Sequence, residues 1–364
     1  MAESATLQER IDTPAEVVDR PRRIAGQVMA ALPWLLVLAA LVITWWWTGV
    51  SRSDIGGYIT YWSLALVVPG TLVHRALRGS RGNLPEDLGF GAAVGLLLEL
   101  AAWAATAATG TQELLRWWPV PVVALFLGVP RLRRHWRIPE PRPLPLTWHY
   151  AMSAVLMVII GWAAVRWRDL PLPPVTHAYY QDLLYHLSLA QELTRAMPFE
   201  LPHLVGEPLR YHYLSDAHMA SASMISGSTP AEVLLRLWLV PVAWTAALVT
   251  AGLGRALAGS WWAGPTIAAV AYLGLPVTIG SVMTSGASAL SLGSPSQTYV
   301  LPLVVVLAGL CVDAVRGQRL GYSWFLVPAL GLACAGAKAS ALPPLIAGLF
   351  LAALVAGARQ RRLP

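Results

Sequence analysis

A series of apolar runs, most of them close to 20 residues long, recurs along the 364 residues of this chain and constrains its fold more than any other feature. About 20 apolar residues in a helix span the hydrocarbon layer of a bilayer. Backbone polar groups in that layer must be paired internally, so spanning segments are helices or strands of a closed barrel. The runs are continuous rather than alternating, which indicates helices. The candidate spans are 27–48, 57–74, 87–108, 117–130, 148–166, 233–254, 261–282, 299–315, 322–337 and 340–357.

The composition supports a membrane protein and excludes other classes. Hydrophobic residues make up 56% of the chain and charged residues only 12%, whereas soluble domains carry roughly 25% charged residues. Cys311 and Cys334 both lie in apolar runs, where cysteine acts as a small core residue, so we expect no disulfide framework. The net charge of +7 comes from short arginine clusters beside the apolar runs. Such clusters orient membrane helices, and no nucleic-acid partner is expected.

The distribution of arginine predicts the topology. If the polar tail 1–26 is cytoplasmic, the spans alternate and the arginine clusters fall on the cytoplasmic side, as the positive-inside rule requires. We therefore expect a multi-pass protein of the bacterial cytoplasmic (inner) membrane, in contact with the lipid bilayer and with its N-terminus in the cytoplasm. The internal clusters are Arg75, Arg78 and Arg81; Arg131, Arg133, Arg134 and Arg137; and Arg316 and Arg319.

This orientation predicts the domain organisation of an all-α bundle of about ten transmembrane helices. The outer loop is expected to carry short amphipathic helices. The segment 285–298 and a turn near Lys338 are placed on the same outer side, so three distant segments meet at one membrane face. The predicted parts are a tail, 1–26; an N-terminal four-helix region, 27–138; a proline-rich cytoplasmic linker, 139–147; and a core, 148–364, with its outer loop 167–232.

The outer loop holds an unusual density of titratable side chains. Five of the eight histidines lie between His177 and His218, interleaved with acids and tyrosines. Asp182 and His186 are four residues apart, and His212 and Asp216 repeat this spacing in reverse order. Residues at i and i+4 share a helix face. Prolines and glycines between the two pairs allow the chain to turn back, so two short helices would bring all four side chains together.

Three interpretations of these residues remain open. Asp182 is a candidate general base, since a carboxylate can take a proton from an acceptor hydroxyl. Carboxylates and imidazoles are also ligands for a divalent cation, and the possible set is Asp182, His186, His212 and Asp216. The third interpretation is structural, with each histidine hydrogen-bonded to its neighbour.

A second candidate for a functional residue is Lys338, the only lysine in the chain. It lies between apolar helices in the segment GAKASALPP. An ionisable group in such a position tends to face a cavity or a substrate. Its ammonium suits a phosphate oxygen, and Arg210 is a further cation for that purpose. The substrate-binding candidates are Lys338, Arg210, His186, His212 and Tyr211.

These residues resemble a known family. An acid after an outward-going helix, YHLSLAQEL, a Pro/Gly turn with GEPLRYH, and a later GAKAS–PP hairpin are similar to the GT-C superfamily of polytopic membrane glycosyltransferases. The likeness covers roughly 148–357 and points to a bacterial, actinobacterial-type member that uses a polyprenyl-phosphate-linked sugar. Many members carry two adjacent acids, whereas Gln181 precedes Asp182 here.

The resemblance implies an activity. A sugar would pass from polyprenyl phosphate to a glycan, lipid or protein acceptor of the cell envelope, with Asp182 as base by position. Lys338, Arg210 and His212 would receive the departing phosphate. Some relatives use a metal and others do not, so a divalent cation remains open.

Two other functions remain open. A transporter or flippase for a lipid-linked or polar solute would use the histidine-rich loop as a gate and would depend on the intramembrane Glu99. A non-catalytic envelope protein would tolerate the loss of both Asp182 and Lys338.

Overall fold

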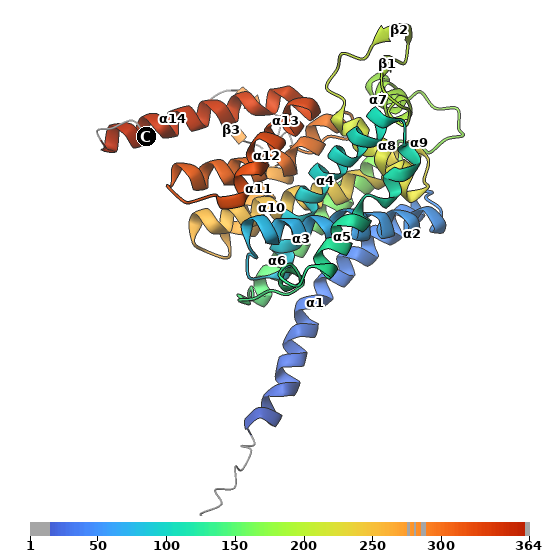
Figure 1. Ribbon diagram of the computed structural model, residues 1–364. Coiled ribbons are helices and arrows are strands. Elements are labelled where there is room, and N and C mark those ends of the chain that lie inside the picture. Colours follow the sequence, from blue (N-terminus) through green and yellow to red (C-terminus); the bar gives the residue numbers. More distant parts are fainter. Residues whose placement is uncertain (1–14, 275–276, 280–281, 285–288, 361–364) are drawn as a thin grey trace, which may run out of the picture.

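The structure is a computed structural model that describes residues 15–274, 277–279, 282–284 and 289–360, and it is almost entirely helical (Figure 1). The α-helices are α1 (Ala15–Trp47), α2 (Arg52–Thr60), α3 (Val68–Arg78), α4 (Leu84–Thr109), α5 (Pro119–Gly128), α6 (Leu146–Arg168), α7 (Gln181–Glu192), α8 (Leu214–Ser226), α9 (Pro230–Glu232), α10 (Leu239–Ala258), α11 (Ala263–Tyr272), α12 (Pro295–Val315), α13 (Leu326–Lys338) and α14 (Leu342–Gln360).

Shorter elements join these helices. Two antiparallel hairpins are formed by β1 (Glu200–Leu201) with β2 (Leu204–Pro208), and by β3 (Val277–Ile279) with β4 (Val282–Thr284). Two π-helical segments, Tyr61–Val67 and Val233–Leu237, lead into α3 and α10. The 3₁₀ segments are Gln112–Trp117, Arg133–Trp136, Gly321–Phe325 and Ala339–Ala341.

The all-helical architecture of a membrane protein agrees with the sequence prediction. In the described part of the chain, seven helical stretches are long and apolar enough to cross a membrane. Two further predicted spans correspond to α5 and α11, which have 10 residues each, about half the length needed to cross the hydrocarbon layer. The seven stretches are Ala25–Trp47, Arg52–Arg78, Leu84–Thr109, Leu146–Arg168, Leu239–Ala258, Pro295–Val315 and Gly321–Val355.

The predicted span 261–282 differs most from the structure. Helix α11 ends at Tyr272, and residues 277–279 and 282–284 form a β-hairpin instead of continuing the helix. Gly274 has φ of +68°, a left-handed conformation that commonly terminates helices. Of the predicted outer segment 285–298, residues 285–288 lie outside the described residues.

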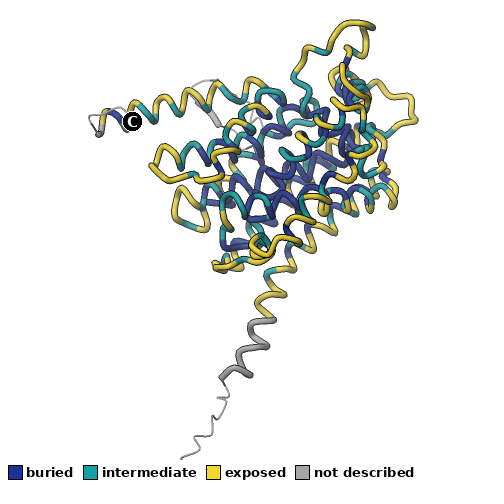
Figure 2. The backbone as a smooth tube through the Cα atoms, in the orientation of Figure 1, coloured by how far each residue is buried: buried dark blue, intermediate teal, exposed yellow. Residues whose placement is uncertain are grey.

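Helices α4 and α10 form the centre of the bundle, where buried residues concentrate (Figure 2). Helix α4 packs against α3 and α10, and α10 also packs against α11 and α12. Glycines allow the closest approach: a Cβ on Gly70 of α3 would lie 2.1 Å from the carbonyl oxygen of Gly91 in α4. Small residues bring membrane helices together in this way, because packing replaces the hydrophobic driving force.

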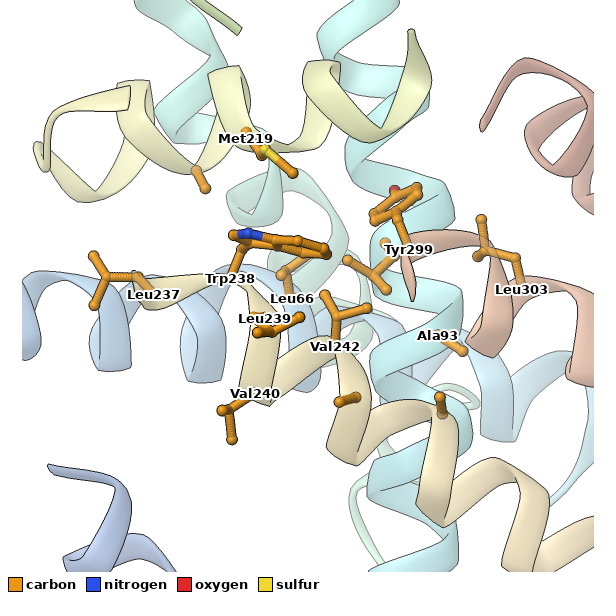
Figure 3. Packing of buried hydrophobic residues seen from close by; sticks show 14 of the residues in the cluster. Leu66, Ala93, Met219, Leu237, Trp238, Leu239, Val240, Val242, Tyr299 and Leu303 are labelled. Carbon is orange, nitrogen blue, oxygen red and sulfur yellow. The ribbon is translucent and has the colours of Figure 1, made fainter. Parts of the chain in front are cut away.

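A cluster of large side chains joins the central helices to α8 and α12. Trp238 and Val242 come from the start of α10, Met219 from α8 and Tyr299 from α12 (Figure 3). These four side chains are all fully buried. The cluster fixes α8 against the membrane-spanning helices, although α8 itself has only 13 residues.

The two ends of the bundle differ in chemistry. At one end, Arg78 pairs with Asp313 near the end of α12, and Arg255 of α10 pairs with Glu86 at the start of α4. At the other end, Trp103 of α4 donates its indole N–H to the carbonyl of Leu193 after α7, at 3.0 Å. Helix α12 connects the ends with 21 residues, a length of roughly 30 Å. The arginine-rich end and the end that carries α7 and α8 are therefore about one bilayer thickness apart.

This separation predicts opposite labelling of two exposed positions. In a background with Cys311 and Cys334 replaced by alanine, Glu207→Cys should react with a membrane-impermeant maleimide in intact cells. Arg319→Cys should react only after permeabilisation. Labelling of both positions from the same side would contradict a bundle that crosses the membrane in this way.

Candidate functional site

The polar loop folds as two short helices joined by a hairpin. Helices α7 and α8 pack against each other, and β1 and β2 form the connection between them (Figure 1). The two short helices occur where the sequence predicts them. The predicted turn between them is a β-hairpin, in which Gly206 has φ of +82°.

His186 and Asp216 form a buried pair across the two helices. The Nδ1 atom of His186 lies 2.8 Å from Oδ1 of Asp216, and the two side chains are 4% and 0% exposed. In the structural interpretation, one of the three that the sequence left open, each histidine would pair within its own helix, Asp182 with His186 and His212 with Asp216. The second of these is wrong because α8 begins only at Leu214, so His212 precedes the helix that carries Asp216. In place of Asp182, His186 takes Asp216 of the other helix as its partner.

Burial shifts the pKa of Asp216. Loss of water raises the pKa of Asp216 above its ordinary value, while hydrogen bonds from His186 and Ser215 act in the opposite direction. A carboxylate that receives a hydrogen bond from an imidazole holds that ring in one orientation. The pair therefore positions the His186 ring against Tyr211, whose centroid is 6.3 Å away.

Asp182 lies in the first turn of α7 and is exposed. It contacts Tyr180, whose pKa is raised by the negative charge of Asp182 and by a hydrogen bond with it. The pKa of Tyr211 is also raised, first by burial and then by the charges of Asp216 and, more weakly, Asp182. Both carboxylates thus act on the same phenol, so the two halves of the loop share one site.

Tyr211 and His212 connect the carboxylates to Lys338. Their rings stack with centroids 4.0 Å apart. Burial lowers the pKa of His212, and the positive charges of Lys338 and His186 lower it further. At neutral pH His212 is therefore an uncharged imidazole beside a cation.

Lys338 ends α13 and turns toward the start of α12. Its backbone is extended, with φ of −159°, which separates α13 from α14. Its Nζ donates to Ser294 Oγ at 3.2 Å and to Ser296 Oγ at 3.5 Å, while an ammonium has three donors. Gly336, two residues earlier, lets Leu214 of α8 approach so closely that a Cβ there would lie 2.5 Å from Leu214 Cδ1. This contact brings the lysine close to the histidine-rich loop 167–232, with which the sequence predicted it would share a site.

Arg210 is exposed in the segment between β2 and α8. It adjoins Tyr211 in sequence and lies on the surface of the loop. The structure therefore brings Asp182, His186, Tyr211, His212, Asp216 and Lys338 into one region, with Arg210 at its edge.

A cavity of about 620 Å³, lined among others by Leu183, the residue after Asp182 in sequence, was not anticipated from the sequence. It lies between the end of α6, the start of α7 and the segment that precedes α12. Arg166 and Asp169, both exposed, contribute charges of opposite sign. Tyr180 lines the cavity and contacts Gly293 on the opposite wall. The sequence feature that could have indicated this cavity is the segment RWRD at residues 166–169, where three charged residues follow an apolar run.

Glu99, whose role the sequence left open, is part of a second buried cluster. Its carboxylate accepts a hydrogen bond from the Tyr61 hydroxyl at 2.5 Å and lies 2.6 Å from Nδ1 of His218. Glu99 and His218 are both 0% exposed. The His218 ring stacks on Tyr299 with centroids 5.1 Å apart. The cluster thus joins α4, α8, α12 and the segment before α3.

The predicted metal set is only partly brought together. His186 and Asp216 are in contact, but across residues 15–274, 277–279, 282–284 and 289–360 no group of three or more His, Cys, Asp or Glu side chains is arranged to hold a metal ion. The set Asp182, His186, His212 and Asp216 remains a prediction.

No family model, curated protein or solved structure matches this chain. The resemblance to the GT-C superfamily therefore rests on the quoted sequence motifs, and the function has to be argued from the chemistry of the site.

Replacement of Asp216 by alanine tests the buried pair. His186 would keep a buried N–H without an acceptor, at a cost of about 1–3 kcal/mol. Asp216→Ala should therefore lower the thermal unfolding midpoint of the purified protein, whereas Glu207→Ala, at an exposed position of the same loop, should leave it unchanged. Equal midpoints for the two variants would refute a stabilising role for the pair.

The protonation of His212 tests the proximity of Lys338. In an NMR titration the His212 imidazole, assigned by comparison with His212→Gln, should have a pKa below 6.5. Lys338→Met removes a neighbouring positive charge, which favours the imidazolium, so the pKa should rise. An unchanged or lower pKa in Lys338→Met would contradict the arrangement.

Proposed function

We propose that this protein is a membrane glycosyltransferase that moves a sugar from a polyprenyl-phosphate donor to an envelope acceptor at the outer face of the bacterial cytoplasmic membrane. One observation carries the proposal: Asp182, Tyr211, His212 and Lys338, from distant parts of the sequence, gather at one end of an apolar helical bundle. A lipid-linked substrate requires a site of this kind, with polar groups beside a membrane-embedded surface.

Asp182 is the proposed general base. It is exposed, so an acceptor hydroxyl can reach its carboxylate, whereas Asp216 is buried and occupied by His186. The carboxylate takes the hydroxyl proton as the acceptor oxygen forms a bond to the anomeric carbon. The bond from that carbon to the phosphate oxygen breaks, the lipid phosphate leaves with the electron pair, and the configuration is inverted.

The departing phosphate requires cations or hydrogen-bond donors. Lys338 supplies an ammonium held by the two serines at the start of α12. Arg166 in the 620 Å³ cavity and Arg210 on the exposed surface of the loop are further cations. Neutral His212 serves as a hydrogen-bonding group rather than as a positive charge.

The cluster around Glu99 favours a second candidate function, transport of a lipid-linked or polar solute. Ionisable side chains inside membrane bundles often mark substrate or proton pathways. Glu99 and His218 are such a pair. In a transferase, the same pair has only to hold α4 and α8 together.

The transferase proposal predicts that the Asp182→Asn variant folds normally but loses sugar-transfer activity. Asparagine keeps the size of the side chain but cannot accept the proton, so the rate of labelled-sugar transfer from polyprenyl phosphate in membranes should fall by about two decades or more. Glu207→Gln, the matched change at another exposed acid of the loop, should transfer at the wild-type rate.

Other outcomes discriminate between the functions. Equal transfer by wild type and Asp182→Asn would show that Asp182 is not the base. Absence of transfer by the wild type, together with solute movement in vesicles that Glu99→Gln abolishes, would favour the transporter.

A further inference from the structure

We infer that a pocket at the arginine-rich end of the bundle binds the phosphate headgroup of an anionic phospholipid. This pocket lies at the opposite end of α12 from Lys338, and the inference is independent of the proposed transferase activity. The side chains that line it come from the end of α3, from α10 and α12, and from the start of α13.

The pocket carries an excess of positive charge. Arg78, Arg81 and Arg316 line it together with one acid, Asp313, which pairs with Arg78. The positive charges of Arg81 and Arg316 are therefore not paired with any acid that lines the pocket. Arginine presents planar donors that match phosphate oxygens, and it is the preferred residue for phosphate recognition.

Arg81 is held in place but is not fully paired. Arg255 binds both oxygens of Glu86, at 2.5 and 2.6 Å, so Arg81 Nε lies 4.0 Å from that carboxylate. This Nε is buried and has no hydrogen-bond partner. The guanidinium is fixed instead over the ring of Phe90, 4.7 Å from its centroid. A buried donor without an acceptor is costly, and a phosphate oxygen would relieve that cost.

His74 supplies a second buried group without a partner. It is 2% exposed, lines the pocket, and stacks on the ring of Phe90 with centroids 5.3 Å apart. Its Nε2 has no hydrogen-bond partner. An imidazole protonated at Nε2 can donate to an anionic oxygen. Two buried side chains with a nitrogen that has no hydrogen-bond partner, His74 and Arg81, thus belong to one pocket.

The volume and the remaining lining indicate a lipid rather than water. The pocket measures about 190 Å³, whereas roughly 10–15 Å³ is enough for one water. Its other walls are apolar and include Leu253, Leu257 and Leu310. Leu257 is 43% exposed, so the apolar wall continues onto the outer surface of the bundle.

The aromatic residues beside the pocket place it at the membrane interface. The segment Gly321–Phe325 directly precedes Leu326, a lining residue, and contacts α3. Tyr322, Trp324 and Phe325 in this segment are 73%, 62% and 74% exposed. Tryptophan and tyrosine mark the level of lipid headgroups. A phosphate at this depth is that of a phospholipid, with its acyl chains along the exposed apolar surface.

The test measures lipid affinity by thermal-shift titration of the delipidated, full-length protein. Phosphatidate should bind at least about tenfold more tightly than phosphatidylcholine, because the arginines repel the choline group. Arg316→Gln, a change at an exposed position that is compatible with folding, should lower the affinity for phosphatidate about tenfold, as should Arg81→Gln. Arg319→Gln, three residues from Arg316 and outside the pocket lining, is the control and should bind normally.

Three results would overturn the inference. They are equal affinity for phosphatidate and phosphatidylcholine, unchanged affinity in both pocket variants, and binding of inorganic phosphate as tight as that of phosphatidate. The last result would identify the ligand as a free anion rather than a lipid.

Discussion

The buried contact between Glu99 and His218 is the interaction on which the arrangement of the outer site depends. It joins α4, in the centre of the bundle, to α8, a 13-residue helix that packs beside the membrane-spanning helices. Tyr61 satisfies the other carboxylate oxygen of Glu99. Both carboxylate oxygens of Glu99 are thus hydrogen-bonded, while the buried Nε2 of His218 has no partner, and this contact limits where α8 can lie. Two residues before His218, Asp216 points to a different partner and holds α7 through His186.

Helix α12 extends from one end of the bundle to the other and contacts charged residues at both ends. Its first turn carries Ser296, which accepts a hydrogen bond from Lys338, and its last turn carries Asp313, which pairs with Arg78. A lipid headgroup bound at the second end would contact α3, α10 and α12 together. Since ligands stabilise the state that binds them, the lipid would tighten the same helices that support the outer site.

Much of the architecture follows from the sequence, because lipid restricts a spanning backbone to very few forms. The apolar runs predicted the helices, and the outer histidine-rich segment predicted α7 and α8. The position of Lys338 near this segment also agrees, since the end of α13 lies against the start of α8. Helices α5 and α11 occur within predicted spans, but their short length of 10 residues each was not anticipated, because hydropathy alone does not show where a helix ends within an apolar run.

Side-chain partners could not be obtained from spacing. The i,i+4 pattern shows which residues share a helix face, but burial between helices decided that His186 pairs with Asp216. Likewise, Glu99 stood out as an acid in an apolar run, whereas its partner His218 lies 119 positions away. Such pairs are products of tertiary packing, and single-sequence patterns do not encode them.

An experimental structure with a non-transferable polyprenyl-phosphonate sugar bound would test the central claim most directly. The account predicts that the sugar lies within hydrogen-bonding distance of Asp182 and that the phosphonate lies beside Lys338, at the end of the bundle that carries α7 and α8. A sugar bound elsewhere, or a phosphonate found only among the arginines at the opposite end, would contradict it.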